Sequence, residues 1–178
     1  MEVFCVADPG EGNGLYPELK AEITRSIKKS GHNLELFELE RNSVAPCLGC
    51  FYCFTKHPGK CVSRDMIPEL KIKARNCDAI ILLTPVLFGN FTSPVKNTID
   101  RGLTAELGIK KKFPPQYIIG YSGDITSEER NTFIDITRLH MGHADIVHPE
   151  FKKMHVESFV TGSKNEIYDV CGKIEKLL

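Results

Sequence analysis

Four of the seven cysteines lie within the stretch CLGCFYCFTKHPGKC, residues 47–61. Their spacing, C-x2-C-x2-C-x7-C, could bring the thiolates of Cys47, Cys50, Cys53 and Cys61 around one inorganic centre. The first three positions repeat the start of the bacterial ferredoxin ligand run, which favours an iron–sulfur cluster. Zinc also accepts four thiolates, but structural zinc sites usually combine two well-separated C-x2-C pairs. Unmetallated thiols are the third alternative, whereas an odd number of cysteines argues against a disulfide framework.

Other residues in or beside this stretch suit a negatively charged cluster. Gly49 and Gly59 permit tight turns that aim backbone amides at sulfide ions. Lys56, Lys60 and Arg64 would offset the negative charge of a cluster held by four thiolates. The local composition therefore agrees with the ligand spacing.

Two further sets of potential metal ligands have a simpler structural interpretation. The remaining cysteines sit in or beside predicted strands or on a helix stripe, where small buried hydrophobes are expected: Cys5, Cys77 and Cys171. His140 and His143 form an H-x2-H pair, with His148 close by. At the end of a predicted helix, and without a recognised motif, solvated or helix-capping histidines are favoured.

Length and charge indicate the class of protein. The 178 residues are enough to bury a core, and we expect one domain, 1–178, with a cysteine-rich insertion at about 46–64. The formal net charge is zero, which argues against nucleic acid or an anionic membrane as a partner. The longest apolar stretch, AIILLTPVLFG, is too short to span a bilayer. Because the start, MEVFCVADPG, lacks the features of a signal peptide, we expect a cytoplasmic protein with reduced thiols.

Short apolar runs alternate with helical periodicity along the chain. The runs predict five strands, at residues 2–7, 34–39, 78–84, 116–122 and 155–162. A helix is predicted after each strand, the first from about Tyr16 and the others with N-terminal caps at Asp65, Ser93, Thr126 and Ser163. The last two caps have capping-box spacing with Glu129 and Glu166. The alternation predicts a three-layer α/β fold, in which a doubly wound five-stranded parallel sheet carries helices on both faces.

Ligands of such sheets bind beyond the carboxyl ends of the strands, so the loops at that edge are candidate sites. The first of these loops, DPGEGNG, contains Gly10, Gly12 and Gly14 between a strand and a helix. Backbone amides at such glycines could cradle a phosphate. Asp8 and Glu11 argue against this interpretation, because acidic side chains repel an anion. A plain strand–helix turn is the alternative.

The second loop, PVLFGNFT, follows the most hydrophobic predicted strand. Its apolar residues 85–88 could form a shelf for a planar cofactor, and Gly89 would allow the backbone to approach closely. Alternatively, Leu87 and Phe88 plug the core beneath the loop. The stretch YSGDITSE, with Tyr121, Ser122 and Gly123, lies at the same edge and should reach the same ligand. A helix-entry turn is the alternative.

The segment from Pro46 to Arg101 resembles the iron–sulfur flavoproteins, a group within the NAD(P)H-dependent FMN reductases. The resemblance includes the cysteine motif, DMIPEL and CDAIILLTPVLFGNFTSPVKNTIDR, and weaker similarity covers nearly the whole chain. It implies a flavodoxin-like sheet ordered 2-1-3-4-5, with FMN at its carboxyl edge. It also implies a homodimer or homotetramer that brings a cluster near a neighbouring subunit's flavin. The implied ligands of a 4Fe–4S cluster are Cys47, Cys50, Cys53 and Cys61. The candidate FMN-binding residues are Pro9, Gly10, Gly12, Asn13, Gly14, Pro85, Val86, Leu87, Phe88, Gly89, Asn90, Ser122 and Gly123.

The first loop departs from the pattern of that family. Family members usually carry Ser-Pro-Arg followed by Gly-Asn-Thr or Ser-Asn-Thr. Here Asp8 replaces the serine, Gly10 the arginine and Gly14 the threonine. These are the hydroxyls and the cation expected to hold the FMN phosphate. In the second loop, Leu87 stands where an aromatic residue is common.

The residues and the resemblance together imply an FMN-dependent oxidoreductase with a 4Fe–4S cluster. It would move electrons between NAD(P)H, or a small electron-carrier protein, and an acceptor. No side chain is predicted to be a catalytic acid or base, because hydride transfer to a flavin needs none. One alternative is an FMN reductase whose cysteines are free thiols or bind zinc. Another is a non-enzymatic module that senses redox state or metal and has lost flavin binding.

Overall fold

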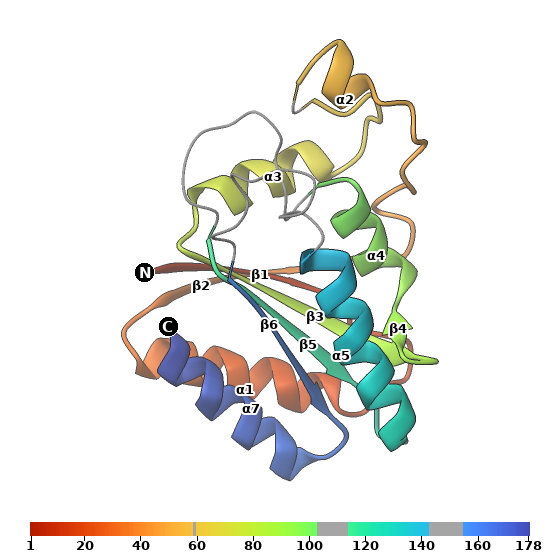
Figure 1. Cartoon of the computed structure of the whole chain (residues 1–178). Coiled ribbons are helices and arrows are strands. Elements are labelled where there is room, and N and C mark those ends of the chain that lie inside the picture. Colours follow the sequence, from red (N-terminus) through yellow and green to blue (C-terminus); the bar gives the residue numbers. More distant parts are fainter. Residues whose placement is uncertain (59, 103–113, 143–154) are drawn as a thin grey trace.

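The computed structural model describes residues 1–58, 60–102, 114–142 and 155–178 (Figure 1). Its strands are β1 (Glu2–Ala7), β2 (Asn33–Glu38), β3 (Ala79–Leu87), β4 (Asn90–Phe91), β5 (Gln116–Tyr121) and β6 (Val156–Thr161). Its helices are α1 (Tyr16–Lys29), α2 (Tyr52–Thr55), α3 (Ile67–Asn76), α4 (Ser93–Asp100), α5 (Ser127–Gly142) and α7 (Lys164–Leu177). Three residues named in the sequence predictions, Gly59, His143 and His148, lie outside the described residues.

The parallel strands form a sheet in the order β2-β1-β3-β5-β6, and β4 pairs with β3 outside this path. For the five predicted strands this is the order 2-1-3-4-5, so the predicted fold class is confirmed. Each neighbouring pair on the path is parallel, and the carboxyl ends of the strands therefore meet at one edge, toward the right of Figure 1.

Helices cover both faces of the sheet, which produces the three predicted layers. In β1, Val3, Cys5 and Ala7 belong to the core under α1 and α7. Phe4 and Val6 belong to the opposite core, under α3, α4 and α5 (Figure 1). This alternation follows from the two-residue period of a strand, and apolar burial on both faces is typical of parallel sheets.

Two of the three cysteines outside the motif are buried as predicted, and the third is half-buried. Cys5 and Cys171 are fully buried in the core under α1 and α7. Cys77 is half-buried against the other core, and its thiol donates to the Ala74 carbonyl at 3.2 Å. Burial raises the pKa of Cys77 to about 11 and the pKa of Cys171 to about 12, so both thiols stay protonated at neutral pH.

The two predicted capping boxes differ in completeness. At α5, Glu129 N–H donates to Thr126 Oγ1 at 3.2 Å and Thr126 N–H donates to Glu129 Oε2 at 2.9 Å, which confirms the first box. At α7, Glu166 N–H donates to Ser163 Oγ at 3.3 Å. The Glu166 carboxylate instead accepts from Gly162 N–H at 2.7 Å, so the second box is only half formed.

The other two predicted caps are shifted by one residue. Met66 occupies the N-cap position of α3, although Asp65 Oδ1 still accepts from Ile67 N–H at 3.2 Å. Ser93 is the first residue of α4 and Thr92 precedes it as the N-cap residue, without a capping hydrogen bond from its side chain. The prediction of Ser93 as a cap was therefore wrong.

The second candidate loop is a β-hairpin. β3 continues to Leu87 and turns through Phe88 and Gly89 into the antiparallel strand β4. Both turn residues have positive φ, 51° and 72°, as the two central positions of a type I′ turn require. A Cβ on Gly89 would lie 2.7 Å from the Thr132 Cβ, so the turn packs closely on α5. The predicted strand end at residue 84 was wrong, because pairing with β5 at Pro85 and with β4 at Val86 and Leu87 extends β3.

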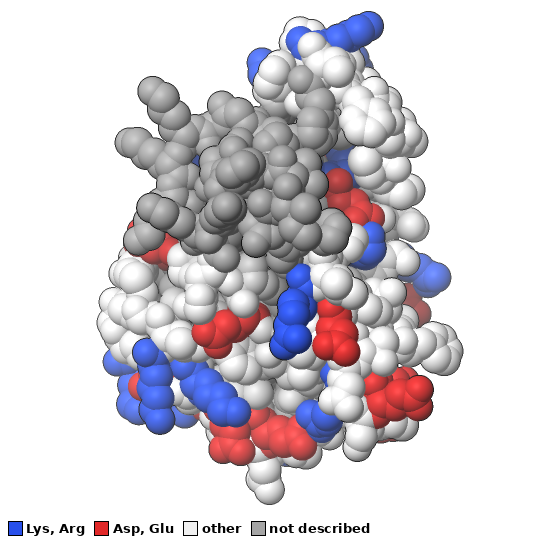
Figure 2. Space-filling view, in the orientation of Figure 1, with Lys and Arg blue, Asp and Glu red and all other residues white. Residues whose placement is uncertain are grey.

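On the described part of the face in Figure 2, Lys and Arg side chains and Asp and Glu side chains are both present. His140 lies near the end of α5 with its Nε2 3.0 Å from Asp100 Oδ1, so this exposed histidine has a carboxylate partner. Among the described residues, no helix has both the length and the apolar character needed to cross a bilayer.

Candidate functional site

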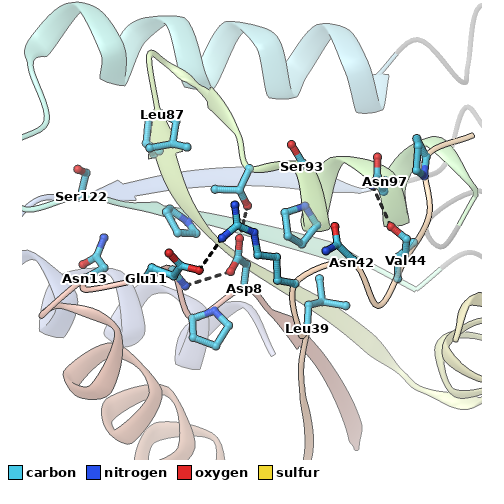
Figure 3. Close-up of a pocket in the computed structure, with 18 of the residues that line it drawn as sticks. Asp8, Glu11, Asn13, Leu39, Asn42, Val44, Leu87, Ser93, Asn97 and Ser122 are labelled. Atoms are coloured by element: carbon cyan, nitrogen blue, oxygen red, sulfur yellow. Dashed lines mark hydrogen bonds and ion pairs between the residues drawn. The ribbon is translucent and has the colours of Figure 1, made fainter.

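A pocket of about 910 Å³ opens at the carboxyl edge of the sheet (Figure 3). It is lined by the first loop after β1, by the end of β3, by the start of α4 and by Ser122 after β5. Residues 39–46, which we call the β2 exit segment, complete the lining. The pocket therefore lies where ligands of doubly wound sheets bind.

The pocket gathers part of the predicted FMN-binding set. The predicted residues that line it are Pro9, Gly10, Asn13, Pro85, Val86, Leu87 and Ser122. The predicted residues that are not part of its lining are Gly12, Gly14, Phe88, Gly89, Asn90 and Gly123. Asn13, Leu87 and Ser122 lie together at one end of the pocket in Figure 3, opposite Asn97 and Val44.

The β2 exit segment was missed as a site element. Its lining residues are Leu39, Arg41, Asn42, Val44, Ala45 and Pro46. Leu39 N–H donates to the Ala7 carbonyl at 2.7 Å, which holds the start of the segment beside the first loop. Asn97 Nδ2 donates to the Val44 carbonyl at 2.9 Å, which ties its other end to α4. The polar string ERNSVAP, placed at a strand end, was the available sequence signal.

The Asp8 side chain is buried and hydrogen-bonded within the protein rather than exposed to a ligand. The residue is only 9% exposed. One carboxylate oxygen accepts from Gly10 N–H at 3.0 Å, and the other accepts from the Thr92 hydroxyl. Thr92 N–H donates to the buried Thr84 Oγ1 at 3.2 Å. Asp8 therefore links the first loop to the junction between β4 and α4.

The Tyr121 side chain also belongs to the core of the protein. Its ring is fully buried and stacks on Tyr16 with 5.9 Å between the ring centroids. Its hydroxyl donates to the Asp8 carbonyl. Burial raises the pKa of Tyr121 well above its usual range, so the phenol stays protonated. The expectation that Tyr121 reaches the ligand was wrong, because its side chain points into the core below the first loop.

Two backbone amides, one within the first loop and one directly after it, already donate to side chains of the loop. Gly10 N–H donates to Asp8, and Leu15 N–H donates to Asn13 Oδ1 at 3.1 Å. The loop keeps the left-handed conformations that its glycines allow, with φ of 65° at Gly10 and 70° at Gly12. An anion at this loop would therefore need donors other than these two amides.

The end of β3 gives the pocket an apolar wall. Pro85, Val86 and Leu87 line it, and Leu87 is 55% exposed. Phe88, at the hairpin turn, is 92% exposed and does not line the pocket. The alternative in which Leu87 and Phe88 plug the core was wrong, because neither side chain is buried.

The four motif cysteines occupy an outlying segment around α2 (Figure 1). Cys47 and Cys50 are exposed, whereas Cys53 and Cys61 are half-buried. Among the described residues, which include all four cysteines, no three His, Cys, Asp or Glu side chains are grouped as metal ligands. The donor set matches a four-thiolate cluster, but the arrangement of the thiols does not by itself fit one.

The cation beside these cysteines is Arg101, and it was not predicted. Lys56, Lys60 and Arg64, the predicted counter-charges, are exposed. Arg101 is 5% exposed, and its Nη2 donates to Cys61 Sγ at 3.2 Å. The available signal was its place at the end of the family-like segment, NTIDR.

Two groups that contact Arg101 have lowered pKa values. Desolvation opposes ionisation of Cys61, but hydrogen bonds from Ser63 and Arg101 outweigh it and lower the pKa of the thiol. At Asp65, desolvation is likewise outweighed by hydrogen bonds from Arg101 and from the amides of Ala45 and Ile67, which lower the pKa of this carboxyl. The guanidinium thus favours the charged forms of both groups.

The pocket fits a flavin mononucleotide in size and in chemistry. Cofactor pockets have volumes of about 300–1,000 Å³ and are mainly apolar, with a few polar groups. Pro85, Val86 and Leu87 offer an apolar wall for a planar ring. Arg41 offers a cation for a phosphate.

Comparison with known proteins identifies relatives along most of the chain. The family model described as NADPH-dependent FMN reductase matches residues 11–142. An iron–sulfur flavoprotein of Archaeoglobus fulgidus is 37% identical over 109 residues, which make up 61% of this chain and 52% of that protein. The chain thus spans about half the length of this relative. An iron–sulfur flavoprotein of Methanocaldococcus jannaschii is 26% identical over 147 residues, covering 83% of this chain and 75% of that protein.

Solved structures share the fold at low sequence identity. The NAD(P)H:quinone oxidoreductase of Methanothermobacter marburgensis has a TM-score of 0.63 and 13% identity, covering 99% of this chain and 94% of that one. An azoreductase of Bacillus anthracis has a TM-score of 0.62 and 13% identity, covering 99% and 98% respectively. Because the family model covers more than half of the sequence, the chain belongs to the NADPH-dependent FMN reductase family.

Proposed function

We propose that the protein is an FMN-dependent oxidoreductase that receives electrons from NAD(P)H or from a small electron-carrier protein. The observation that carries this proposal is the pocket at the carboxyl edge of the sheet, in a chain of the FMN reductase family. When bound there, FMN supplies hydride and single-electron chemistry that side chains lack.

The residues of the chain would bind and orient the cofactor. Pro85, Val86 and Leu87 would pack against the planar ring and exclude water from one of its sides. Asn13 and Ser122, at the same end of the pocket as Leu87, offer polar groups near that wall (Figure 3). No side-chain acid or base is required, because hydride transfer moves no proton through the protein.

We further propose that Cys47, Cys50, Cys53 and Cys61 bind a 4Fe–4S cluster. Two observations support this: the ligand spacing, and the names of the relatives in Archaeoglobus fulgidus and Methanocaldococcus jannaschii. Binding would have to draw the thiols closer than they are in the described segment. Zinc or free thiols are the other possible states of the same cysteines.

A flavin titration tests the first proposal. Quenching of FMN fluorescence should saturate at one flavin per chain, and the loaded protein should oxidise NADH or NADPH. Leu87→Asp should weaken FMN binding about tenfold or more, because it places a charge on the apolar wall. Leu139→Asp is the matched control, since Leu139 is a 65% exposed leucine on α5. A folded chain that shows no saturable flavin binding would contradict the proposal and favour the redox- or metal-sensing module.

Iron and sulfide analysis tests the second proposal. After anaerobic reconstitution, about four iron and four sulfide ions per chain are expected. Cys50→Ser should lower this content strongly, whereas Cys77→Ser, which lies outside the motif, should leave it unchanged. Zinc in place of iron, or no metal at all, would reject the cluster without affecting the flavin proposal.

We propose a homodimer or homotetramer, on the basis of the resemblance to the iron–sulfur flavoproteins. We also propose a cytoplasmic location, where the cysteine thiols would stay reduced. Sedimentation of the loaded protein measures the assembly, and a single-chain mass would reject it.

A further inference from the structure

We propose that Arg41 binds the terminal phosphate of FMN and that Glu11 holds the Arg41 guanidinium in place until that phosphate displaces it. The inference rests on the proposed function, namely that the pocket binds FMN. It assigns the phosphate contact to the β2 exit segment rather than to the first loop.

Charge singles out Arg41 within the pocket. The charged residues of its described lining are Asp8, Glu11 and Arg41, so Arg41 is the one cation among them. Both oxygens of the Asp8 carboxylate already accept hydrogen bonds, from Gly10 N–H and from the Thr92 hydroxyl. A phosphate in this pocket would therefore find its counter-charge at Arg41.

The first loop itself offers no cation for a phosphate, so the counter-charge has to come from another segment. Its residues 8–14 include no serine, threonine, lysine or arginine. The amides of Gly10 and of Leu15, the residue after the loop, donate to side chains of the loop itself. The guanidinium of Arg41 nevertheless reaches this loop, because Nη1 lies 3.0 Å from Glu11 Oε1.

The present partner of Arg41 is weakly held. The Arg41 side chain is 80% exposed and the Glu11 side chain is 85% exposed. Exposed ion pairs of this kind contribute little to stability, because water and salt screen them. A phosphate with nearly two negative charges accepts two parallel hydrogen bonds from a guanidinium, so it should displace a single exposed carboxylate.

The backbone places Arg41 suitably for this exchange. Leu39, two residues earlier, is buried and fixed to the Ala7 carbonyl at 2.7 Å. Asn42, the next residue, lines the pocket and has a positive φ of 67°. The segment is thus anchored on the sheet edge, while the Arg41 side chain is free to turn between Glu11 and a ligand.

Comparing FMN with riboflavin tests the inference, because the two ligands differ in the phosphate alone. Arg41→Gln should weaken FMN binding about 10- to 100-fold, the range for losing hydrogen bonds from a charged group. Its affinity for riboflavin should change less than about twofold. Glu11→Gln should strengthen FMN binding about two- to fivefold, because it removes a competing anion, and should leave riboflavin binding unchanged.

Arg138→Gln is the matched control, since Arg138 also has an exposed side chain paired with an exposed carboxylate, that of Asp135, on α5. It should alter neither affinity. If Arg41→Gln weakens FMN and riboflavin equally, or neither, the assignment to the phosphate is wrong while flavin binding stands. If the wild-type chain binds neither ligand, the proposed function fails and this inference fails with it.

Discussion

The Arg101 guanidinium and the Asp65 carboxylate form a two-pronged ion pair at the base of the cysteine-rich segment. Nη2 donates to Oδ1 at 3.0 Å, and Nη1 donates to Oδ2. The Arg101 side chain is 1% exposed and the Asp65 side chain 14%. Arg101 Nη1 also donates to the Ala45 carbonyl at 3.0 Å, and Ala45 N–H donates to Asp65 at 3.0 Å. The two ends of the segment are therefore tied together through one buried arginine.

Replacing Arg101 with Gln should destabilise the fold and detach the segment. The change leaves the Asp65 carboxylate without its cation, and breaking a buried pair costs about 3 kcal/mol or more of unfolding free energy. Urea unfolding measures this loss. In this variant, a protease should also cut within residues 46–64 before it cuts at other sites. Arg138→Gln, which breaks an exposed ion pair with Asp135, should unfold like the wild type, and an equal loss in both variants would contradict the role given to Arg101.

Acid should remove the contribution of Asp65. The lowered pKa of this carboxyl means that its stabilisation is complete above its unfolded pKa, about 3.9, and is lost as pH falls through the folded pKa. Asp65→Asn should therefore be less stable than the wild type at pH 7, and the difference should shrink below about pH 4. Chemical unfolding of both proteins at pH 7 and pH 3 measures it. A difference that does not depend on pH would show that Asp65 acts through shape rather than charge.

The main elements were predictable because their signals are local. Apolar alternation and helical periodicity placed β1 and α1 correctly, and the capping box at Thr126 marked the start of α5. The order of the strands followed from the resemblance. The position of the pocket followed from topology, because carboxyl ends of parallel strands share an edge.

The missed features depend on contacts between distant segments. Arg101 meets Cys61 across 40 positions, and Arg41 meets Glu11 across 30. No local pattern encodes such a meeting. The β3–β4 hairpin was missed for a different reason: Phe88 takes a left-handed conformation that is rare for a bulky side chain. Hairpin turns of this type are usually marked by Asn-Gly or Asp-Gly.

Two glycines of the first loop should differ sharply when replaced. Gly10 and Gly12 have similar positive φ, 65° and 70°, so alanine strains the backbone by about 1 kcal/mol or more at each. At Gly10 the new Cβ would also lie 2.6 Å from Pro85 Cγ, whereas at Gly12 nothing lies within 4 Å. Gly10→Ala should therefore lose about 1–3 kcal/mol more stability and weaken FMN binding. Thermal unfolding and flavin titration of the pair measure both effects, and equal losses would reject close packing on Pro85.

The Thr92 hydroxyl should matter more than that of Thr98 in the same region. Thr92→Val leaves the buried Asp8 carboxylate without one of its donors, at a cost of about 1–3 kcal/mol. Thr98 is also fully buried, but its hydroxyl donates to the Val95 carbonyl within the helix at 2.7 Å. Thr98→Val should cost less unfolding free energy, because losing a hydrogen bond to a neutral carbonyl costs less than losing one to a charged carboxylate. Denaturant unfolding compares them, and a larger loss for Thr98→Val would contradict the role given to Asp8.

Replacing Phe88 should stabilise the protein. It holds a φ of 51° at the first central position of the hairpin turn, and its side chain is 92% exposed, so burial does not offset the strain. Asparagine accepts this conformation readily, and Phe88→Asn should raise the free energy of unfolding by about 0.5–1 kcal/mol. Leu48→Asn replaces another exposed apolar residue, 73% exposed and without a positive φ, and should bring no such gain. A rise in melting temperature for Phe88→Asn alone would locate the strain in the turn. If Phe88→Asn is no more stable than the wild type, the left-handed conformation of Phe88 does not strain the turn.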